Sequence, residues 1–349
     1  MAYWRFVEAY YVKDGKPTSE VETIRQAVRF VRHLYGNSEA RDFGPLCLKA
    51  VRNAMVEHPI TRKTKVVDPV SKAVREEVIV IRHGLSRRYI NKQIGRTKRM
   101  FAWAVEEELL PAAVHEALTR VKGLRKGKGL AREKPRIPPV ADAAVEAVLP
   151  YVPPAIAAMI ELQRLSGGRP QDVVGIRVID MAGPIWEYRP RTYKTEHHND
   201  NAIPEKERVV FLGPRAQAIL KPYITMSLVD YLFSPTRSEQ DRNTRRHQNR
   251  QSPMTPSQDR RKKRGRKRAP LRDHFDVASY RRAIRRACLK AGIPMWFPLQ
   301  LSHARGTEVR KRFGLEATQA VLGHSELGVT QVYAEVDRDA ARRVMAEIE

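Results

Sequence analysis

A histidine and a tyrosine near the end of the chain have a spacing that could serve phosphoryl transfer. His324 lies in the segment Leu-Gly-His324-Ser, and Tyr333 follows nine positions later in Thr330-Gln-Val-Tyr333. A phenol can attack phosphorus when cationic groups stabilise the non-bridging oxygens and an acid protonates the leaving oxygen. Taken alone, a tyrosine near a helix end is more often a packing residue than a nucleophile. The pair must therefore be judged together with the cationic residues elsewhere in the chain.

Other segments supply residues of the types that this chemistry requires. Arg169 lies in Gly-Gly-Arg169-Pro with Asp172 three positions later, and Lys194 lies between two strand-like segments, 186–190 and 208–212. We find no convincing metal-ligand spacing and no phosphate-binding glycine loop of the nucleotidase type. The sequence therefore favours chemistry without a metal or another cofactor.

These motifs together resemble the tyrosine recombinase, or phage integrase, family. The family has a Leu-Gly-His-Ser signature before a Thr-x-x-Tyr nucleophile, an arginine in a Gly-Arg-Pro turn that opens a helix, and a lysine in a hairpin turn. The resemblance implies that Tyr333 is the nucleophile, and that Arg169, Lys194 and His324 are catalytic. It also implies that Asp172 orients the region around the arginine.

One motif departs from the family pattern. The segment from Trp296 to Leu315 is similar to the box that normally begins His-x-Leu-Arg-His, and the alignment of its His303 places Leu299 at the usual histidine and Ser302 at the usual second arginine. Serine offers one neutral donor where the family has a charged fork. Arg305 is expected one helical turn after Ser302, so its long side chain is a candidate substitute.

The resemblance implies a mechanism, a partner and an assembly. Tyr333 would attack a DNA phosphodiester to form a 3′-phosphotyrosyl link, and Lys194 would protonate the departing 5′ oxygen. Double-stranded DNA would be the partner, and four protomers would act on paired DNA sites. Two alternatives remain: a DNA-binding protein that keeps the scaffold without cutting, and a topoisomerase of related chemistry.

The composition agrees with an anionic partner. The chain has 65 Lys and Arg against 39 Asp and Glu, a net charge of +26 over 349 residues. We favour nucleic acid over a membrane surface, because no basic amphipathic helix with a bulky apolar face appears at either end. No apolar stretch reaches the ~20 residues of a membrane span. With two cysteines and no secretory pattern, we expect a cytoplasmic, nucleoid-associated protein.

The patterns predict a mainly α protein with a small antiparallel sheet, arranged as a two-domain DNA clamp. We expect a helical core-binding domain over 1–121, a basic Gly- and Pro-rich linker over 122–139, and a catalytic domain over 140–349. A segment at 235–272 has fourteen Lys or Arg and three Asp or Glu, which indicates an exposed basic insertion. A small hairpin is expected around 66–67 and 78–81.

The longest predicted helix, over residues 86–110, has its charges reversed relative to the helix dipole. Cations fill its first half and Glu106, Glu107 and Glu108 lie near its end. Stability alone would not select this order, which an external anion would explain. We therefore expect DNA contacts from Arg87, Arg88, Lys92, Arg96, Lys98 and Arg99, with a merely solvated face as the alternative.

Overall fold

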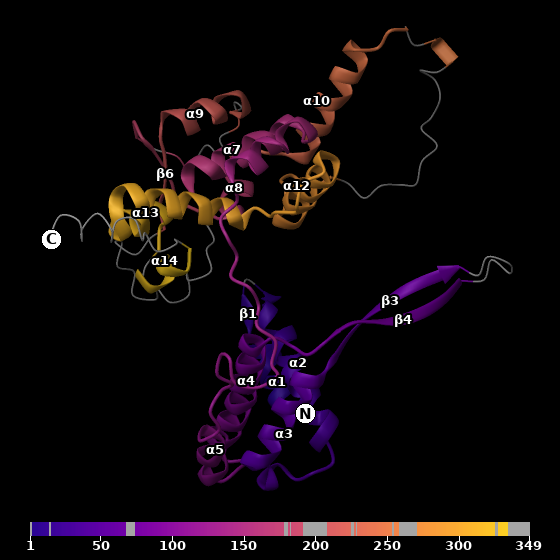
Figure 1. Cartoon of the computed structure of the whole chain (residues 1–349), viewed down its shortest axis with the longest axis vertical. Coiled ribbons are helices and arrows are strands. Elements are labelled where there is room, and N and C mark those ends of the chain that lie inside the picture. Colours follow the sequence, from indigo (N-terminus) through magenta and orange to yellow (C-terminus); the bar gives the residue numbers. More distant parts are fainter. Residues whose placement is uncertain are drawn as a thin grey trace. The chain divides into compact units, whose positions relative to one another are not determined.

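The protein is described by a computed structural model (Figure 1). The residues described are 2–13, 15–67, 74–177, 181, 183–190, 208–224, 227, 229–252, 255–257, 271–324 and 327–333. Two compact units divide the chain, Met1–Arg136 (unit 1) and Ile137–Glu349 (unit 2).

Unit 1 is a small helical bundle. Its elements are α1 (Ala2–Tyr10), β1 (Val12–Lys13), β2 (Lys16–Pro17), α2 (Ser19–Tyr35), η1 (Ala40–Asp42), α3 (Pro45–Glu57), α4 (Arg87–Glu106) and α5 (Ala112–Thr119). The core consists of apolar side chains at helical spacing, among them Leu48, Val51 and Met55 of α3 against Ile90 and Ile94 of α4. Ile90, Ile94 and Phe101 of α4 recur at helical spacing, and this core buries all three.

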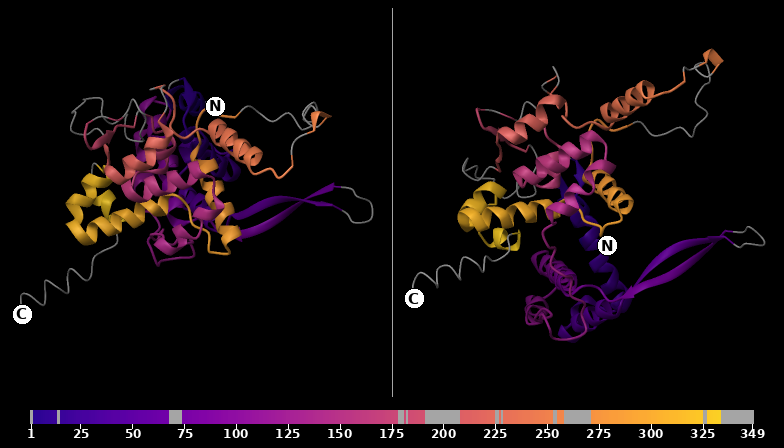
Figure 2. Two further views of the ribbon diagram at one scale, coloured as in Figure 1. Left: turned by 90° about the horizontal axis from the view of Figure 1, so that it is seen from above. Right: turned by 45° about the horizontal axis from the view of Figure 1, so that its top comes forward.

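A long two-stranded ribbon interrupts unit 1 between α3 and α4. Strands β3 (Pro59–Val67) and β4 (Val74–His83) pair antiparallel, with a register shift next to Ile60. The predicted hairpin is thus confirmed, and it is longer than the sequence indicates. The ribbon extends away from the helices of its unit in every view (Figure 2).

The segment after α5 is attached to unit 1. The backbone N–H of Leu124 donates to Asn91 Oδ1 at 2.8 Å, and Asn91 Nδ2 donates to the carbonyl of Leu124 at 3.0 Å. Arg52 Nη1 donates to the carbonyl of Lys122 at 2.9 Å, and Glu133 forms an ion pair with Arg87. Residues 122–133, which the sequence predicts to be a linker, therefore lie against the helices of unit 1.

Unit 2 is also mostly helical. Its elements are α6 (Asp142–Glu146), η2 (Leu149–Tyr151), α7 (Pro154–Ser166), α8 (Pro170–Val174), β5 (Trp186–Tyr188), β6 (Val210–Leu212), α9 (Pro214–Leu220), η6 (Lys221–Tyr223), α10 (Pro235–Gln248), α12 (Val277–Ala291), α13 (Leu299–Leu322) and α14 (Leu327–Tyr333). Helix α7 lies in the core and contacts α8, α9 and α13. Strands β5 and β6 pair antiparallel. The fold class is therefore the mainly α one with small antiparallel sheets that the sequence predicts.

The basic insertion begins as a helix without a buried face. Helix α10 covers Pro235–Gln248, and none of its residues is buried. A helix that is polar all round gains no stability from packing of an apolar stripe. Most of the remaining insertion, including residues 258–270, lies outside the described residues.

Candidate active site

The turn that carries Arg169 is fixed against α13 by a glycine. Helix α7 ends at Gly167, whose φ of 67° is left-handed, and Arg169 then caps α8. A Cβ atom at Gly167 would lie 2.8 Å from Leu322 Cδ2 and 3.0 Å from Arg305 Cγ, so both conformation and space require glycine. Asp172 Oδ2 accepts the backbone N–H of Arg169 at 2.8 Å. The Arg169 turn therefore lies directly beside α13.

A buried arginine ties this turn to the end of α13. Arg208 Nη2 and Nε donate to Asp172 Oδ2 at 2.7 and 3.3 Å. Its Nη1 donates to the carbonyls of Leu322 at 2.7 Å and Gly323 at 2.9 Å. Both members of the ion pair are about 5% exposed. All three side-chain nitrogens of Arg208 are used, and they join α8 to the residues immediately before His324.

His324 lies in this same cluster. It is 7% exposed, and its Nδ1 is 3.0 Å from Thr330 Oγ1 of α14. Burial, followed by the positive charges of Arg169 and Arg208 and by the imidazole of His303, lowers the pKa of His324 to about 4. The imidazole is therefore neutral at neutral pH. Arg169 and His303 lie close enough to act on it electrostatically.

The predicted catalytic residues are brought together as far as the structure describes them. Arg169, Asp172, His303 and His324 are gathered where the turn between α7 and α8 lies beside α13, close to the contact of α13 with α14. Tyr333 is the last residue of α14, but its side chain is outside the described part. Lys194 also lies outside the described residues.

Ser302 is buried in a polar network and does not face an open site. It is 1% exposed, and its Oγ donates to the carbonyl of Gly168 at 2.7 Å. Gln163 Nε2 donates to Ser302 Oγ and to the same carbonyl, at 3.3 and 3.1 Å, and Tyr280 donates its hydroxyl hydrogen to Gln163 Oε1 at 3.1 Å. Ser302 thus holds the residue before Arg169 in place. Its neighbour in the motif, Leu299, begins α13 and is half-buried.

Arg305 lies close to the Arg169 turn and has an acidic partner. Its aliphatic stem packs on Gly167, and its Nη1 is 2.9 Å from Glu308 Oε2. The side chain is 30% exposed. A guanidinium therefore stands near the place where the family pattern has its second arginine, paired with Glu308 in this structure.

Two of the predicted DNA-contacting cations of α4 share one carboxylate of α2. Arg96 Nε and Nη2 donate to the two oxygens of Glu20 at 2.8 and 2.6 Å, and Arg99 Nη2 donates to Glu20 at 2.7 Å. Burial raises the pKa of Glu20, but these hydrogen bonds and charges outweigh it, so the net pKa is lowered. Arg96 is 13% exposed, against 53% for Arg99. Glu20 of the same unit therefore supplies part of the negative charge that the cations of α4 require.

The other four cations of this helix also separate into two classes. Arg87 pairs with Glu133, and Lys98 Nζ donates to the carbonyl of Val121 at 2.7 Å. Burial lowers the pKa of Lys98. By contrast, Arg88 and Lys92 are exposed one turn apart on one face of α4.

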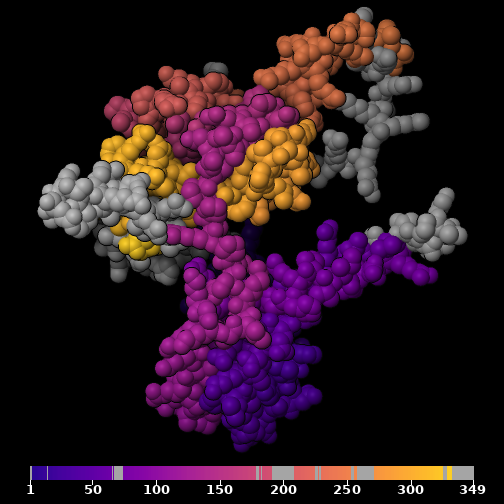
Figure 3. Space-filling view, viewed as in Figure 1, coloured from indigo at the N-terminus to yellow at the C-terminus, as the bar shows by residue number. Residues whose placement is uncertain are grey.

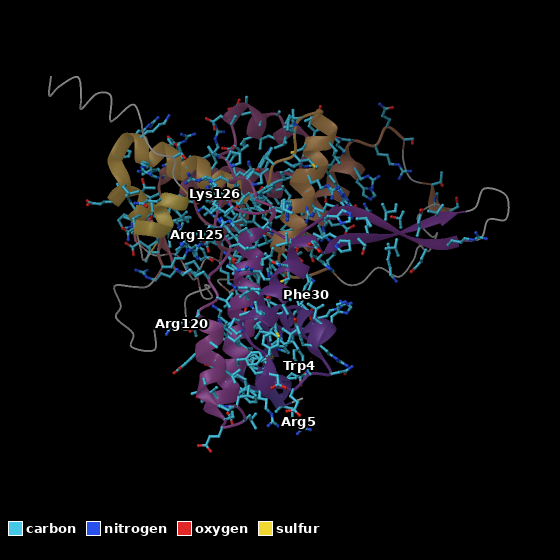
Figure 4. All side chains as sticks on the ribbon, turned by 60° about the horizontal axis from the view of Figure 1, so that its bottom comes forward. Trp4, Arg5, Phe30, Arg120, Arg125 and Lys126 are labelled. Carbon is cyan, nitrogen blue, oxygen red and sulfur yellow. The ribbon has the colours of Figure 1, made fainter. Side chains whose placement is uncertain are left out.

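A cationic cavity that the sequence does not predict lies in unit 1. It has a volume of about 470 Å³ and is bordered by α3, the end of α5 and the segment after it. Six cations and no carboxylate line it: Lys49, Arg52, Arg120, Lys122, Arg125 and Lys128. Figure 4 labels Arg120 and Arg125. The Gly- and Lys-rich composition of residues 122–128 is the signal in the sequence that could have indicated this cavity. The attachment of this segment to α3 places its cations next to those of α3.

Among the described helices, none is both long and apolar enough to cross a membrane. In the described part of the chain, His, Cys, Asp and Glu do not gather in threes in a way that could hold a metal ion.

No protein-family model and no curated protein matches the sequence. Solved structures do share its fold. The integrase of the transposon Tn1549 in complex with transposon right end DNA has a TM-score of 0.62 at 14% identity, covering 99% of this chain and 97% of that one. The XerH site-specific recombinase bound to a palindromic difH substrate has 0.59 at 12%, covering 94% and 79%. A lambda integrase dimer bound to a COC′ core site has 0.56 at 10%, covering 96% and 93%.

These similarities define the class of fold. The chain has the fold of the tyrosine recombinases over nearly its whole length, as the sequence motifs predict. At 10 to 14% identity the comparison concerns the fold, so the activity must be argued from the residues.

Proposed function

We propose that this protein is a site-specific DNA recombinase or integrase that cuts and rejoins DNA through a tyrosine. The observation that supports this most directly is the cluster of Arg169, His303 and His324 around the buried Arg208–Asp172 pair. Each of these residues comes from a different part of unit 2. The cluster lies at the contact of α13 with α14, the helix that ends at Tyr333. Cationic and imidazole groups are suited to stabilise the negative charge of a phosphodiester.

The proposed reaction begins with attack of the Tyr333 oxygen on the phosphorus of one DNA strand. The bond from phosphorus to the 5′ oxygen breaks, Lys194 gives that oxygen a proton, and a 3′-phosphotyrosyl link remains. The 5′-hydroxyl of another strand then attacks the link and releases Tyr333. The number of phosphoester bonds is conserved, so the exchange requires no nucleotide hydrolysis.

In this scheme Arg169 and His324 stabilise the charge on the non-bridging oxygens. The Arg169 fork provides parallel charged donors. A neutral His324 that accepts the Thr330 hydroxyl hydrogen at Nδ1 carries its own proton on Nε2 and can donate it to a phosphate oxygen. Asp172 and Arg208 orient both groups through the contacts described above.

We propose that cleavage is slow, because Leu299 and Ser302 replace two usual catalytic residues. A single donor to a developing oxyanion is commonly worth ~10²- to 10³-fold in rate, and an arginine finger ~10³- to 10⁵-fold. Ser302 gives its hydroxyl hydrogen to Gly168 and so adds no charge to the site. Arg305, whose Nη1 is bonded to Glu308, is the candidate to restore part of the loss.

A nicked suicide substrate tests the proposal, because the nicked fragment leaves and traps the covalent intermediate. We expect slow formation of a protein–DNA adduct, no adduct with Tyr333→Phe, and faster formation with Ser302→Arg. Thermal denaturation of each variant would establish that it is folded. Adduct formation by a folded Tyr333→Phe variant would contradict the assignment of the nucleophile.

A DNA-binding protein that occupies sites without cutting is the second candidate, and the buried hydrogen bonds of Ser302 favour it. Binding of duplex DNA with no adduct from any variant would establish this candidate. Relaxation of a supercoiled plasmid without pairing of two sites would instead indicate a topoisomerase. For the recombinase, we propose double-stranded DNA as the partner, four protomers on paired sites and a nucleoid-associated location in the cytoplasm.

A further inference from the structure

Both ends of the peptide group that leads into Arg169 are held by buried side chains. The backbone N–H of Arg169 donates to Asp172 Oδ2 at 2.8 Å. The carbonyl of Gly168, on the other side of the same peptide group, accepts hydrogen bonds from Ser302 Oγ at 2.7 Å and from Gln163 Nε2 at 3.1 Å. Because a peptide group is planar, these bonds together fix the direction in which the chain enters Arg169.

Gln163 lies at the centre of this network. It belongs to α7 and is completely buried, and its Nε2 also donates to the carbonyl of Pro298 at the start of α13, at 3.0 Å. Backbone carbonyls only accept hydrogen bonds, so the amide nitrogen must face Gly168 and Pro298. The amide oxygen Oε1 then requires a donor of its own, since a buried acceptor without a partner is costly.

Tyr280 of α12 supplies that donor. Helix α12 lies beside α7 on the surface of unit 2 (Figure 3), and the Tyr280 hydroxyl donates to Gln163 Oε1 at 3.1 Å. The Tyr280 side chain is completely buried. Burial, followed by the charge of Glu161, raises the pKa of Tyr280 well above its usual value, so the hydroxyl keeps its hydrogen. The bond from Tyr280 therefore stabilises the amide orientation that serves Gly168.

We propose that Gln163 and Tyr280 are positioning residues for Arg169. Tyr280 orients the Gln163 amide. This amide and Ser302 hold the Gly168 carbonyl, which sets the direction of the turn that carries Arg169. Gln163 and Tyr280 act through the turn and not on the DNA, because both are completely buried. Their effect on the reaction rests on the recombinase function proposed above, whereas their effect on the turn does not.

Tyr280→Phe in the full chain tests the proposal, because it removes the hydroxyl and keeps the ring. With the nicked substrate, we expect the rate of adduct formation at saturating DNA to fall by roughly 10- to 100-fold, as for a misplacement of about 1 Å. The DNA concentration that gives half the maximal rate should stay the same. Tyr223→Phe removes a hydroxyl from a tyrosine of the same unit that packs on Phe233, and it should change neither quantity. A parallel loss of rate and affinity in Tyr280→Phe would indicate a merely structural role and contradict the proposal.

A double substitution separates the orientation of the amide from packing. Gln163→Met has a similar length and no hydrogen-bonding amide. If Tyr280 acts through this amide, Tyr280→Phe should have no further effect on the adduct rate in the Gln163→Met background. Urea denaturation establishes that each variant is folded under the conditions of the assay. Effects of the two substitutions that multiply would show that Tyr280 acts by another route.

Hydrogen exchange of the Arg169 amide tests the effect on the turn without any cleavage. This N–H is bonded to Asp172, and in Tyr280→Phe it should exchange roughly tenfold faster, because the peptide group loses part of its support. In Tyr223→Phe it should keep the natural rate. Faster exchange in Tyr280→Phe, with no adduct from the natural protein, would mean that the recombinase proposal fails while the positioning holds. Unchanged exchange in Tyr280→Phe would overturn the positioning itself.

Discussion

Arg208 is the residue that joins the two halves of the candidate site. Its guanidinium contacts a carboxylate of α8 and two carbonyls at the end of α13, and no solvent replaces these partners because the pair is buried. Nothing in the sequence singles it out. It is the first residue of a predicted strand, and its partner Asp172 lies 36 positions earlier. Its role is visible only when the fold brings the two together.

Arg208→Met should destabilise unit 2 and abolish cleavage. The variant leaves Asp172 buried without a countercharge, which typically costs about 3 to 5 kcal/mol. It also frees the backbone before His324. Urea denaturation measures the first effect and the suicide-substrate assay the second. Arg215→Met on α9, where the arginine is exposed, is the matched control and should change neither. Equal midpoints for the two variants would contradict this role of the ion pair.

His324 should make the stability of the protein depend on pH between about 4 and 6.5. The folded pKa is about 4, below the ordinary value of 6.5, so in this window the unfolded chain binds a proton that the folded chain does not. Stability is therefore full above 6.5 and falls as the pH is lowered. Relative to His324→Gln, the natural protein should lose about 2 to 3 kcal/mol between pH 7 and pH 4.

The measurement is the free energy of unfolding in urea at a series of pH values. Carboxylates also titrate in this range, but they are shared by the variant and cancel in the difference. His33→Gln, at an exposed site on α2, provides the control and should follow the natural protein. A constant difference between the natural protein and His324→Gln would show that the imidazole is not held neutral by its surroundings.

At the scale of elements, α4 separates cations with partners inside unit 1 from cations that are exposed. Arg96→Met should lower the stability of unit 1 by about 1 to 3 kcal/mol, because it removes two charge-assisted hydrogen bonds to Glu20. Arg88→Ala and Lys92→Ala should change stability by less than about 0.5 kcal/mol, since both residues are exposed. Their effect should appear in duplex DNA binding. Thermal denaturation and fluorescence anisotropy distinguish the two classes, and equal stability loss for all three variants would contradict the division.

The sequence predicts elements better than partners. The stripe at residues 90, 94 and 101 predicts α4 within a few residues of its bounds, since burial of an apolar face is a local pattern. The charge order of the same helix also signals an anion. It does not reveal that Glu20, 76 positions away from Arg96, supplies part of that anion. Long-range pairs of this kind depend on the tertiary fold.

The candidate site divides in the same way. The motifs predict Arg169, Asp172 and His324, because their residue types and spacing are unusual together. The loss of an arginine at Ser302 is also evident from the motif. The new role of Ser302 as an anchor for Gly168 is not, because it depends on the approach of α13 to the end of α7. The attachment of 122–133 to unit 1 is hidden for the same reason, as its composition alone is typical of a flexible segment.

For the whole molecule, the net charge of +26 predicts DNA binding that weakens steeply with salt. The contribution of each cation to this salt dependence depends on its position in the structure. Arg120 lines the cationic cavity of unit 1, whereas Arg5 is an exposed arginine of α1, and both are labelled in Figure 4. Arg120→Ala and Arg5→Ala change the net charge equally. If the cavity holds a phosphate, Arg120→Ala should reduce the slope of log K against log salt by about 0.9, and Arg5→Ala should leave it unchanged.

Fluorescence anisotropy with a labelled duplex, at several salt concentrations, gives both slopes. Long-range attraction by the total charge would lower affinity in the two variants alike, since it depends on net charge. Loss of a direct contact reduces the slope, because the removed side chain no longer displaces a counterion from the DNA. A difference between the variants therefore locates the contact at the cavity. Equal slopes would show that this concentration of positive charge in unit 1 acts at a distance and does not bind the backbone.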